Sequence, residues 1–244
     1  MTRFLIDKKQ LVKSGSLLIL FIYIGFLYLD AMTKDLSNNT TLNLKYIIIV
    51  ICFIISLLIG KGGHNRTDTR LVRIARFFTL IADYYLVILD EFKLGIFFFC
   101  LVQITYIIRH SLMENKKYKN LIFLCLTLIT AIIISTKISI SSFDKKLIIL
   151  GLIYAALLIS SVYSAIRTIK SSRYPKKSAL LIATGMSLFF MCDLNVAFFN
   201  LVGNVPIVLF NGENIRFYTG FLIWVFYVPS QLMLALSGFS DTMR

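Results

Sequence analysis

The chain has 244 residues, of which 58% are hydrophobic and 16% charged, and its formal net charge is +14. A typical soluble domain has about 45–50% apolar and about 25% charged residues. The apolar residues gather in blocks of roughly 18–25, the length that a helix needs to cross about 30 Å of hydrocarbon. This composition excludes a soluble enzyme and indicates a protein of the lipid bilayer.

Eight apolar blocks predict an all-α, polytopic membrane protein with eight transmembrane helices. We expect these helices over residues 15–31, 44–60, 72–89, 94–113, 120–139, 147–165, 178–202 and 217–238. Together they occupy roughly 160 residues, so only short loops remain between them. Residues 1–244 are therefore expected to form a single integral-membrane domain.

The positive charges are divided unequally between alternate loops. Counted from the N-terminal tail, 18 Lys and Arg residues fall on one side of the expected bundle and 7 on the other, with Arg76 inside the third block. Positive residues favour the cytoplasmic side of short loops, which predicts cytoplasmic N- and C-termini. Because the charges form no single basic face, they do not indicate nucleic-acid binding. The host membrane, bacterial plasma membrane or internal eukaryotic membrane, stays open.

Cysteine and histidine usage gives no sign of a metal centre, a cofactor or a disulfide framework. All four cysteines lie inside apolar blocks, where thiols behave as small buried hydrophobes. The two histidines, His64 and His110, lie at loops or helix ends. We expect both histidines to be solvated.

Two aspartates lie deep inside expected helices. Asp83 is eleven residues past position 72 and Asp193 fifteen residues past position 178, roughly 16 Å and 22 Å into their helices. An aspartate at the centre of a membrane helix costs about 2.5–3.5 kcal/mol on insertion scales, so a functional role is the default. Both helices run in the same direction, which allows the two carboxyls to face one cavity. Asp83 and Asp193 are the candidate catalytic residues.

A polar stripe extends from Asp83 along its helix. Arg76, Thr79, Asp83 and Asp90 are spaced by 3, 4 and 7 residues, which predicts that they share one helix face. We expect the long side chain of Arg76 to reach the cytoplasmic interface.

Further polar side chains on the fourth, seventh and eighth helices extend the acidic pocket. The candidate substrate-contacting residues among them are Gln103, Tyr106, Asn200, Tyr227 and Gln231. In the eighth helix Pro229 removes a backbone donor and frees a carbonyl near Val225. Such a break is tolerated where it lines a polar cavity.

The two aspartate-bearing segments resemble the YhhN family of multi-pass membrane proteins, which includes the lysoplasmalogenases. The likeness lies in FFTLIADYYL at 77–86, KLG at 93–95, LVQITY at 101–106 and GMSLFFMCDL at 185–194. Residues 227–231 are similar to the closing Tyr-and-Gln helix of the family. The order of the motifs and the eight-helix count agree with the family over most of the chain.

The chain departs from the family pattern at several positions. Ala82 and Cys192 precede the aspartates where the family tends to have Ser or Gly, and Gln103 stands where a His is common. Lys45 is similar to a Lys that begins the second helix, but Tyr46 replaces the Pro that usually follows.

The resemblance implies hydrolysis of the 1-alkenyl ether bond of a lysoplasmalogen, giving a fatty aldehyde and glycerophosphoethanolamine or glycerophosphocholine. A vinyl ether is cleaved by protonation of its β-carbon and capture of the cation by water, which requires a protonated acid and a second polar group. Because removal from water favours the neutral form of a carboxyl, a buried aspartate suits the acid role. We expect Asp83 to donate the proton and Asp193 to orient water, with Lys45 meeting the lysophospholipid phosphate at the outer interface.

Two other functions fit the same residues. A small transporter or lipid-translocating protein also uses intramembrane acids as proton or ion relays. A membrane scaffold is the third reading, although it leaves both aspartates without a role. Headgroup preference and oligomeric state are not predicted by the sequence.

Overall fold

Each of the eight apolar blocks forms an α-helix in the computed structural model, which describes residues 2–112, 117–137, 144–171, 174–202 and 214–240. The helices are α1 (Thr2–Thr33), α2 (Asn39–Leu58), α3 (Arg66–Asp83), α4 (Phe92–Leu112), α5 (Lys117–Lys137), α6 (Lys145–Arg167), α7 (Lys176–Val202) and α8 (Ile215–Leu236). This confirms the all-α class and the number of helices. The expected ends at 113 and 139 lie outside the described residues.

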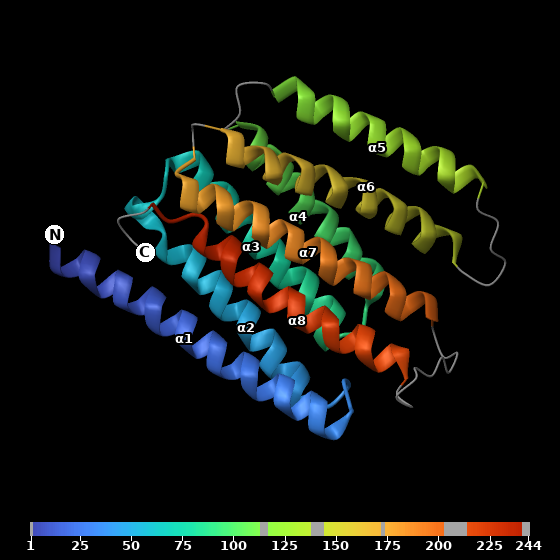
Figure 1. The fold of residues 1–244 in the computed structure, drawn as a ribbon, viewed down its shortest axis with the longest axis horizontal. Helices are drawn as coiled ribbons and strands as arrows, with labels where there is room; N and C mark the ends of the chain where they lie inside the picture. The colour runs from blue at the N-terminus through green and yellow to red at the C-terminus, as the bar shows by residue number, and fades with distance from the viewer. Residues whose placement is uncertain (1, 113–116, 138–143, 172–173, 203–213, 241–244) are drawn as a thin grey trace.

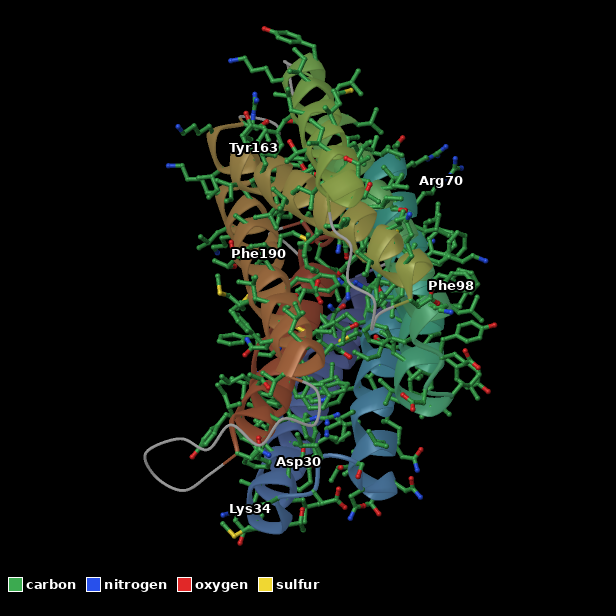
Figure 2. The ribbon with its side chains drawn as sticks, turned by 90° about the vertical axis from the view of Figure 1, so that its right-hand side faces the viewer. Asp30, Lys34, Arg70, Phe98, Tyr163 and Phe190 are labelled. Atoms are coloured by element: carbon green, nitrogen blue, oxygen red, sulfur yellow. The ribbon has the colours of Figure 1, made fainter. Side chains whose placement is uncertain are left out.

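The helices form an antiparallel bundle with α5 at one edge and α1 at the other (Figure 1). Helix α5 packs on α6, whereas α1 packs on α2 and α8, and α3, α4, α7 and α8 lie between them. The beginning of α1 and the end of α8 lie at the same end of the bundle, which we call the near end. Figure 2 places Asp30 and Lys34 at the opposite, far end.

Seven of the eight helices are long and apolar enough to cross a membrane, in a search of the described residues. The exception is α3, because its charged residues are Arg66, Asp68, Arg70, Arg73, Arg76 and Asp83. Large apolar side chains such as Phe21, Leu121 and Leu201 are exposed on the outside of the bundle. Soluble monomers rarely expose apolar patches of this extent. The molecule is therefore a multi-pass membrane protein.

Helix α1 begins thirteen residues before its expected start at position 15. Its first turns carry Lys8, Lys9 and Lys13, and lysine is a good helix former even outside an apolar block. Hydrophobicity marked the part of the helix that meets lipid, and the helix itself continues beyond it.

The α-helical part of α3 ends at Asp83, earlier than expected. The chain then forms a π-helical segment, Tyr84–Ile88. π-Helical turns are rare in proteins, and those that occur are often located at functional sites. Asp90 follows this segment with a positive φ of 54° and is exposed. The expectation that Asp90 continues the polar face of the helix is therefore wrong, while Arg76, Thr79 and Asp83 are all buried as the spacing predicts.

The backbone carbonyl freed by Pro229 has found a partner on another helix. Pro229 lies inside α8, and the hydroxyl of Tyr23 on α1 donates to the Val225 carbonyl oxygen at 3.0 Å. The expected break in the hydrogen-bond ladder is confirmed, and it serves to attach α1 to α8.

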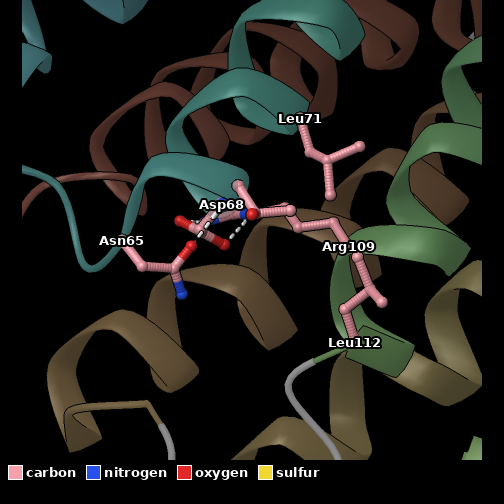
Figure 3. A pocket seen from close by; sticks show the side chains of 6 residues that line it. Asn65, Asp68, Leu71, Arg109 and Leu112 are labelled. Carbon is pink, nitrogen blue, oxygen red and sulfur yellow. Dashed lines mark hydrogen bonds and ion pairs between the residues drawn. The ribbon is translucent and has the colours of Figure 1, made fainter.

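A buried ion pair joins four chain segments at the near end of the bundle. Arg109 on α4 donates from Nε to Asp68 Oδ1 at 2.8 Å (Figure 3). It also donates from Nη1 to Ser237 Oγ at 2.9 Å. Tyr174 donates to the same Asp68 oxygen at 2.7 Å. Burial raises the pKa of Tyr174, so its hydroxyl remains a donor. A hollow of about 260 Å³ beside this ion pair is lined in part by Asn65, Asp68 and Arg109.

One of the two histidines does not occupy the solvated position that we expected. His110 is 1% exposed, stacks on Tyr106 and lies with Nδ1 3.3 Å from Ser164 Oγ. The expectation for His110 is wrong because helix packing, which composition does not reveal, closes around the end of α4. His64 is half-buried, with Nε2 3.3 Å from the Ser237 carbonyl oxygen, and keeps part of its surface exposed.

Candidate active site

Asp83 is presented to the bundle interior by the last turn of α3. Its carboxyl is buried, at 3% exposure for the residue, and Oδ2 accepts a hydrogen bond of 2.5 Å from the Tyr227 hydroxyl on α8. Tyr227 is itself buried. One carboxyl oxygen is thus fixed by a neighbouring helix, and Oδ1 is left for another interaction.

Asp193 has a similar environment on α7. The hydroxyl of Tyr154, on α6, donates a short hydrogen bond to Asp193 Oδ2. Both of these residues are half-buried, in contrast to Asp83 and Tyr227. Each deep aspartate therefore has a tyrosine partner on an adjacent helix, but the two differ in accessibility.

Aromatic side chains fill the space between the two Tyr–Asp pairs. The ring of Phe99, on α4, lies 6.2 Å from that of Tyr154 and 6.5 Å from that of Tyr227, measured between centroids. Phe189, on α7, contacts both Phe99 and Tyr227. The two aspartates thus belong to one interior site with apolar, aromatic walls.

Arg76 lies in the same interior and does not reach the interface as we expected. The residue is 1% exposed; Nη1 donates to Gln231 Oε1 on α8, and Nη2 donates to the Tyr106 hydroxyl on α4 at 2.6 Å. The expectation of an interfacial arginine is wrong because both partners draw the guanidinium inward, from helices distant in sequence. Tyr106 and Gln231 thus contact α3 at Arg76, about two helical turns before Asp83.

Gln103 also faces the interior, one turn before Tyr106 on α4. It is fully buried, and its Oε1 accepts a hydrogen bond of 2.6 Å from Ser161 Oγ on α6. Four of the expected substrate-contacting residues are therefore buried in the bundle interior: Gln103, Tyr106, Tyr227 and Gln231.

The other two expected contacts lie elsewhere. Asn200 is exposed near the end of α7, and its side-chain amide donates to the Val196 carbonyl oxygen of its own helix. Lys45 is fully buried near the beginning of α2, with Nζ 2.7 Å from Asp30 Oδ2. In the structure neither side chain reaches the acidic pair.

Tyr154 is a site residue that the sequence reasoning missed. A single tyrosine in an apolar helix has no signal of its own. Its spacing of seven residues from Ser161 places both on one face of α6, and this weak polar stripe was the available clue. Within the described residues, no group of three His, Cys, Asp or Glu side chains has the arrangement of a metal site.

The fold and the site together define a class: a multi-pass α-helical membrane protein with two tyrosine-bonded carboxyls in its interior. The chain belongs to the YhhN family, which matches residues 40–238, and this family includes lysoplasmalogenases. Neither the curated proteins nor the solved structures contain a match to the chain. Helix α1, which ends at Thr33, precedes the matched region.

Proposed function

We propose that this protein is a membrane hydrolase that cleaves the 1-alkenyl ether bond of lysoplasmalogens. The observation that carries the proposal is the pair Asp83 and Asp193, each held by a tyrosine hydroxyl at one aromatic-walled site of a YhhN-family chain. Two carboxyls with different environments suit acid–base hydrolysis because one can act as the acid and the other as the base.

In the first step, a protonated Asp83 transfers its proton to the β-carbon of the vinyl ether. The carbon–carbon π electrons form the new C–H bond, the ether oxygen stabilises the cation at the α-carbon, and Asp83 becomes a carboxylate. Tyr227 stabilises this carboxylate through its hydrogen bond to Oδ2. General acid catalysis of this kind contributes about 10²–10⁴-fold to the rate.

In the second step, water adds to the α-carbon and Asp193 accepts the proton that water loses. The resulting hemiacetal collapses as its hydroxyl proton moves to the departing glycerol oxygen, which gives a fatty aldehyde and the glycerol hydroxyl of the glycerophospho-base. The proton on Asp193 then returns to Asp83, and one water is consumed overall. We assign the water to Asp193 because it is half-buried, whereas Asp83 is almost completely enclosed.

The side chains near this pair suit the positioning of a lipid with one polar end. Phe99 and Phe189 offer apolar contacts for the hydrocarbon chain, and Gln103 carries a buried amide nitrogen, Nε2, without a hydrogen-bond partner among the described residues. Roles for Asn200 and Lys45 in substrate binding stay predictions.

The test is release of fatty aldehyde from lysoplasmenylethanolamine by the detergent-purified protein. We expect Asp83→Asn and Asp193→Asn each to lower turnover by about 10²–10⁴-fold, because each removes one proton-transfer group. Asp35→Asn is the matched control, since Asp35 is exposed in the α1–α2 loop, and it should retain wild-type turnover.

Full turnover in both aspartate variants would contradict the proposal. If folded wild type releases no aldehyde but moves the intact lipid across a proteoliposome membrane, the protein is a transporter and the hydrolase assignment fails.

A further inference from the structure

Three cations are buried in the described part of the bundle, and two of them have a carboxylate partner. Lys45 is paired with Asp30 at 2.7 Å, and Arg109 with Asp68 at 2.8 Å. Arg76, the third, has no carboxylate within ion-pair distance among the described residues. Its hydrogen bonds go to two neutral groups, Gln231 and Tyr106.

Arg76 also has unused hydrogen-bonding capacity. Its Nε is buried without a hydrogen-bond partner in the described structure, and so is Nε2 of Gln231. Two N–H donor groups, on two side chains that are hydrogen-bonded to each other, are therefore enclosed in the described structure with no acceptor. Buried donors without acceptors are costly and rare in folded proteins.

The physical cost of this arrangement indicates a missing anion. A buried cation is costly unless an anion or a full set of hydrogen-bond acceptors compensates it. Asp83 follows Arg76 by seven residues on α3, about 10 Å along the helix. As the proton donor of the proposed reaction, however, Asp83 must be neutral and then supplies no counter-charge.

We propose that Arg76, together with Gln231, binds the phosphate group of the lysophospholipid substrate. A guanidinium fork matches phosphate oxygens, and Arg Nε and Gln Nε2 are the donors that a phosphate would satisfy. This inference rests on the proposed function for the identity of the lipid, and the buried, unpaired charge stands independently of it.

The position of Arg76 also sets the direction of the bound lipid. Arg76 precedes Asp83 by seven residues, about two helical turns, and lies closer to the near end of the bundle. The phosphate then points toward the near end, the vinyl ether lies at Asp83, and the hydrocarbon chain extends toward the far end. Lys45, at the far end and already paired with Asp30, is not needed for the phosphate.

Binding of an uncleavable ligand tests this site separately from catalysis. The probes are a 1-O-alkyl lysophosphatidylethanolamine, whose saturated ether has no carbon–carbon double bond to protonate, the matching 1-O-alkylglycerol without phosphate, and inorganic phosphate. Calorimetric titration of the full-length wild type in detergent should show about 10–100-fold tighter binding of the phospholipid than of the alkylglycerol.

Arg76→Gln should remove this preference while leaving alkylglycerol binding unchanged. Arg73→Gln is the matched control, because Arg73 lies one turn away and donates to the carbonyls of Ser56 and Leu57 on α2; it should keep the preference. An unchanged preference in Arg76→Gln would overturn the inference, as would inorganic phosphate that binds without competing with the phospholipid.

A second variant keeps the test decisive if Arg76→Gln does not fold. Arg76→Lys retains the buried charge but loses the fork, so we expect the preference to fall at least severalfold. A folded Arg76→Lys with wild-type preference would refute the site. Aldehyde release with no phosphate preference defeats this inference alone, whereas phosphate preference with no aldehyde release defeats the proposed function alone.

Discussion

The hydroxyl groups of Tyr227 and Tyr154 occupy one oxygen of Asp83 and one of Asp193. At the residue scale, this leaves each carboxyl with a single free oxygen for chemistry. The tyrosines therefore restrict where a proton can be given or taken, and they hold the carboxyl planes in fixed orientations across helix boundaries.

Removal of either hydroxyl should slow the reaction without destroying the site. For Tyr227→Phe and Tyr154→Phe we expect a decrease in kcat of about 10–100-fold, the equivalent of one hydrogen bond to a charged group. KM should change little because the aromatic rings remain. Steady-state aldehyde release gives both constants.

The control for these variants is Tyr163→Phe, which removes a hydroxyl on α6 that contacts Arg167 outside the site. It should leave kcat at the wild-type value. A normal kcat in both Tyr227→Phe and Tyr154→Phe would show that the carboxyls act without their tyrosine partners.

Single-sequence reasoning found residues that are anomalous by themselves and missed those defined by a partner. Asp83 and Asp193 were evident because a carboxyl in an apolar helix is costly. The buried position of the Arg76 side chain depends on its hydrogen bond to Gln231, a residue 155 positions away. Such long-range pairs are set by helix packing, so the sequence placed Arg76 at the interface and the structure corrects it.

At the scale of secondary-structure elements, the attachment of α1 to α8 depends on the bond from Tyr23 to the Val225 carbonyl that Pro229 leaves free. Tyr23→Phe should lower the free energy of unfolding by about 1–3 kcal/mol, because it leaves that carbonyl without a partner. In a Pro229→Ala background the new backbone N–H can bond the same carbonyl. In that background Tyr23→Phe should lower the free energy of unfolding by roughly 0.5 kcal/mol or less.

Chemical unfolding of the four proteins in detergent completes this double-mutant cycle. If Tyr23→Phe lowers the free energy of unfolding equally in the wild-type and Pro229→Ala backgrounds, the Tyr23 hydroxyl does not act through the Val225 carbonyl.

The existence of the helices was predictable, and their ends were less so. A long apolar block predicts a helix, and each of the eight blocks contains one, although α3 is too charged to be identified as a membrane span by apolar length alone. The π-helical segment Tyr84–Ile88 was not predicted, because an apolar run of this kind is equally compatible with a continuing α-helix. A change in hydrogen-bond register has no compositional signal.

At the scale of the whole molecule, the charged helix α3 determines whether the chain crosses the membrane eight times. Cysteine accessibility can test this in a Cys125→Ser background, since the other three cysteines are buried. Thr67 lies in the first turn of α3, Asp90 follows α3 and its π-helical segment, and Asp35 lies between α1 and α2. All three side chains are exposed.

A membrane-impermeant maleimide should label Asp35→Cys and Asp90→Cys from outside sealed cells, and Thr67→Cys only after permeabilisation. This pattern follows from the Lys and Arg asymmetry together with a spanning α3. Labelling of Asp90→Cys and Thr67→Cys from the same side would mean that α3 does not cross. The sequence predicted this orientation, but the edge positions of α1 and α5 depend on packing that it does not encode locally.

Trp224 is the single tryptophan of the chain. Its ring packs on those of Phe26, on α1, and Tyr227, with distances between ring centroids of 6.0 and 5.6 Å. The Lys45 ammonium lies 5.2 Å from the centroid of the Trp224 ring. Indole fluorescence responds to the charge and packing around the ring. The unlabelled protein thus contains an optical reporter between its first helix and the tyrosine that holds Asp83, and changes at either position can be followed through one emission band.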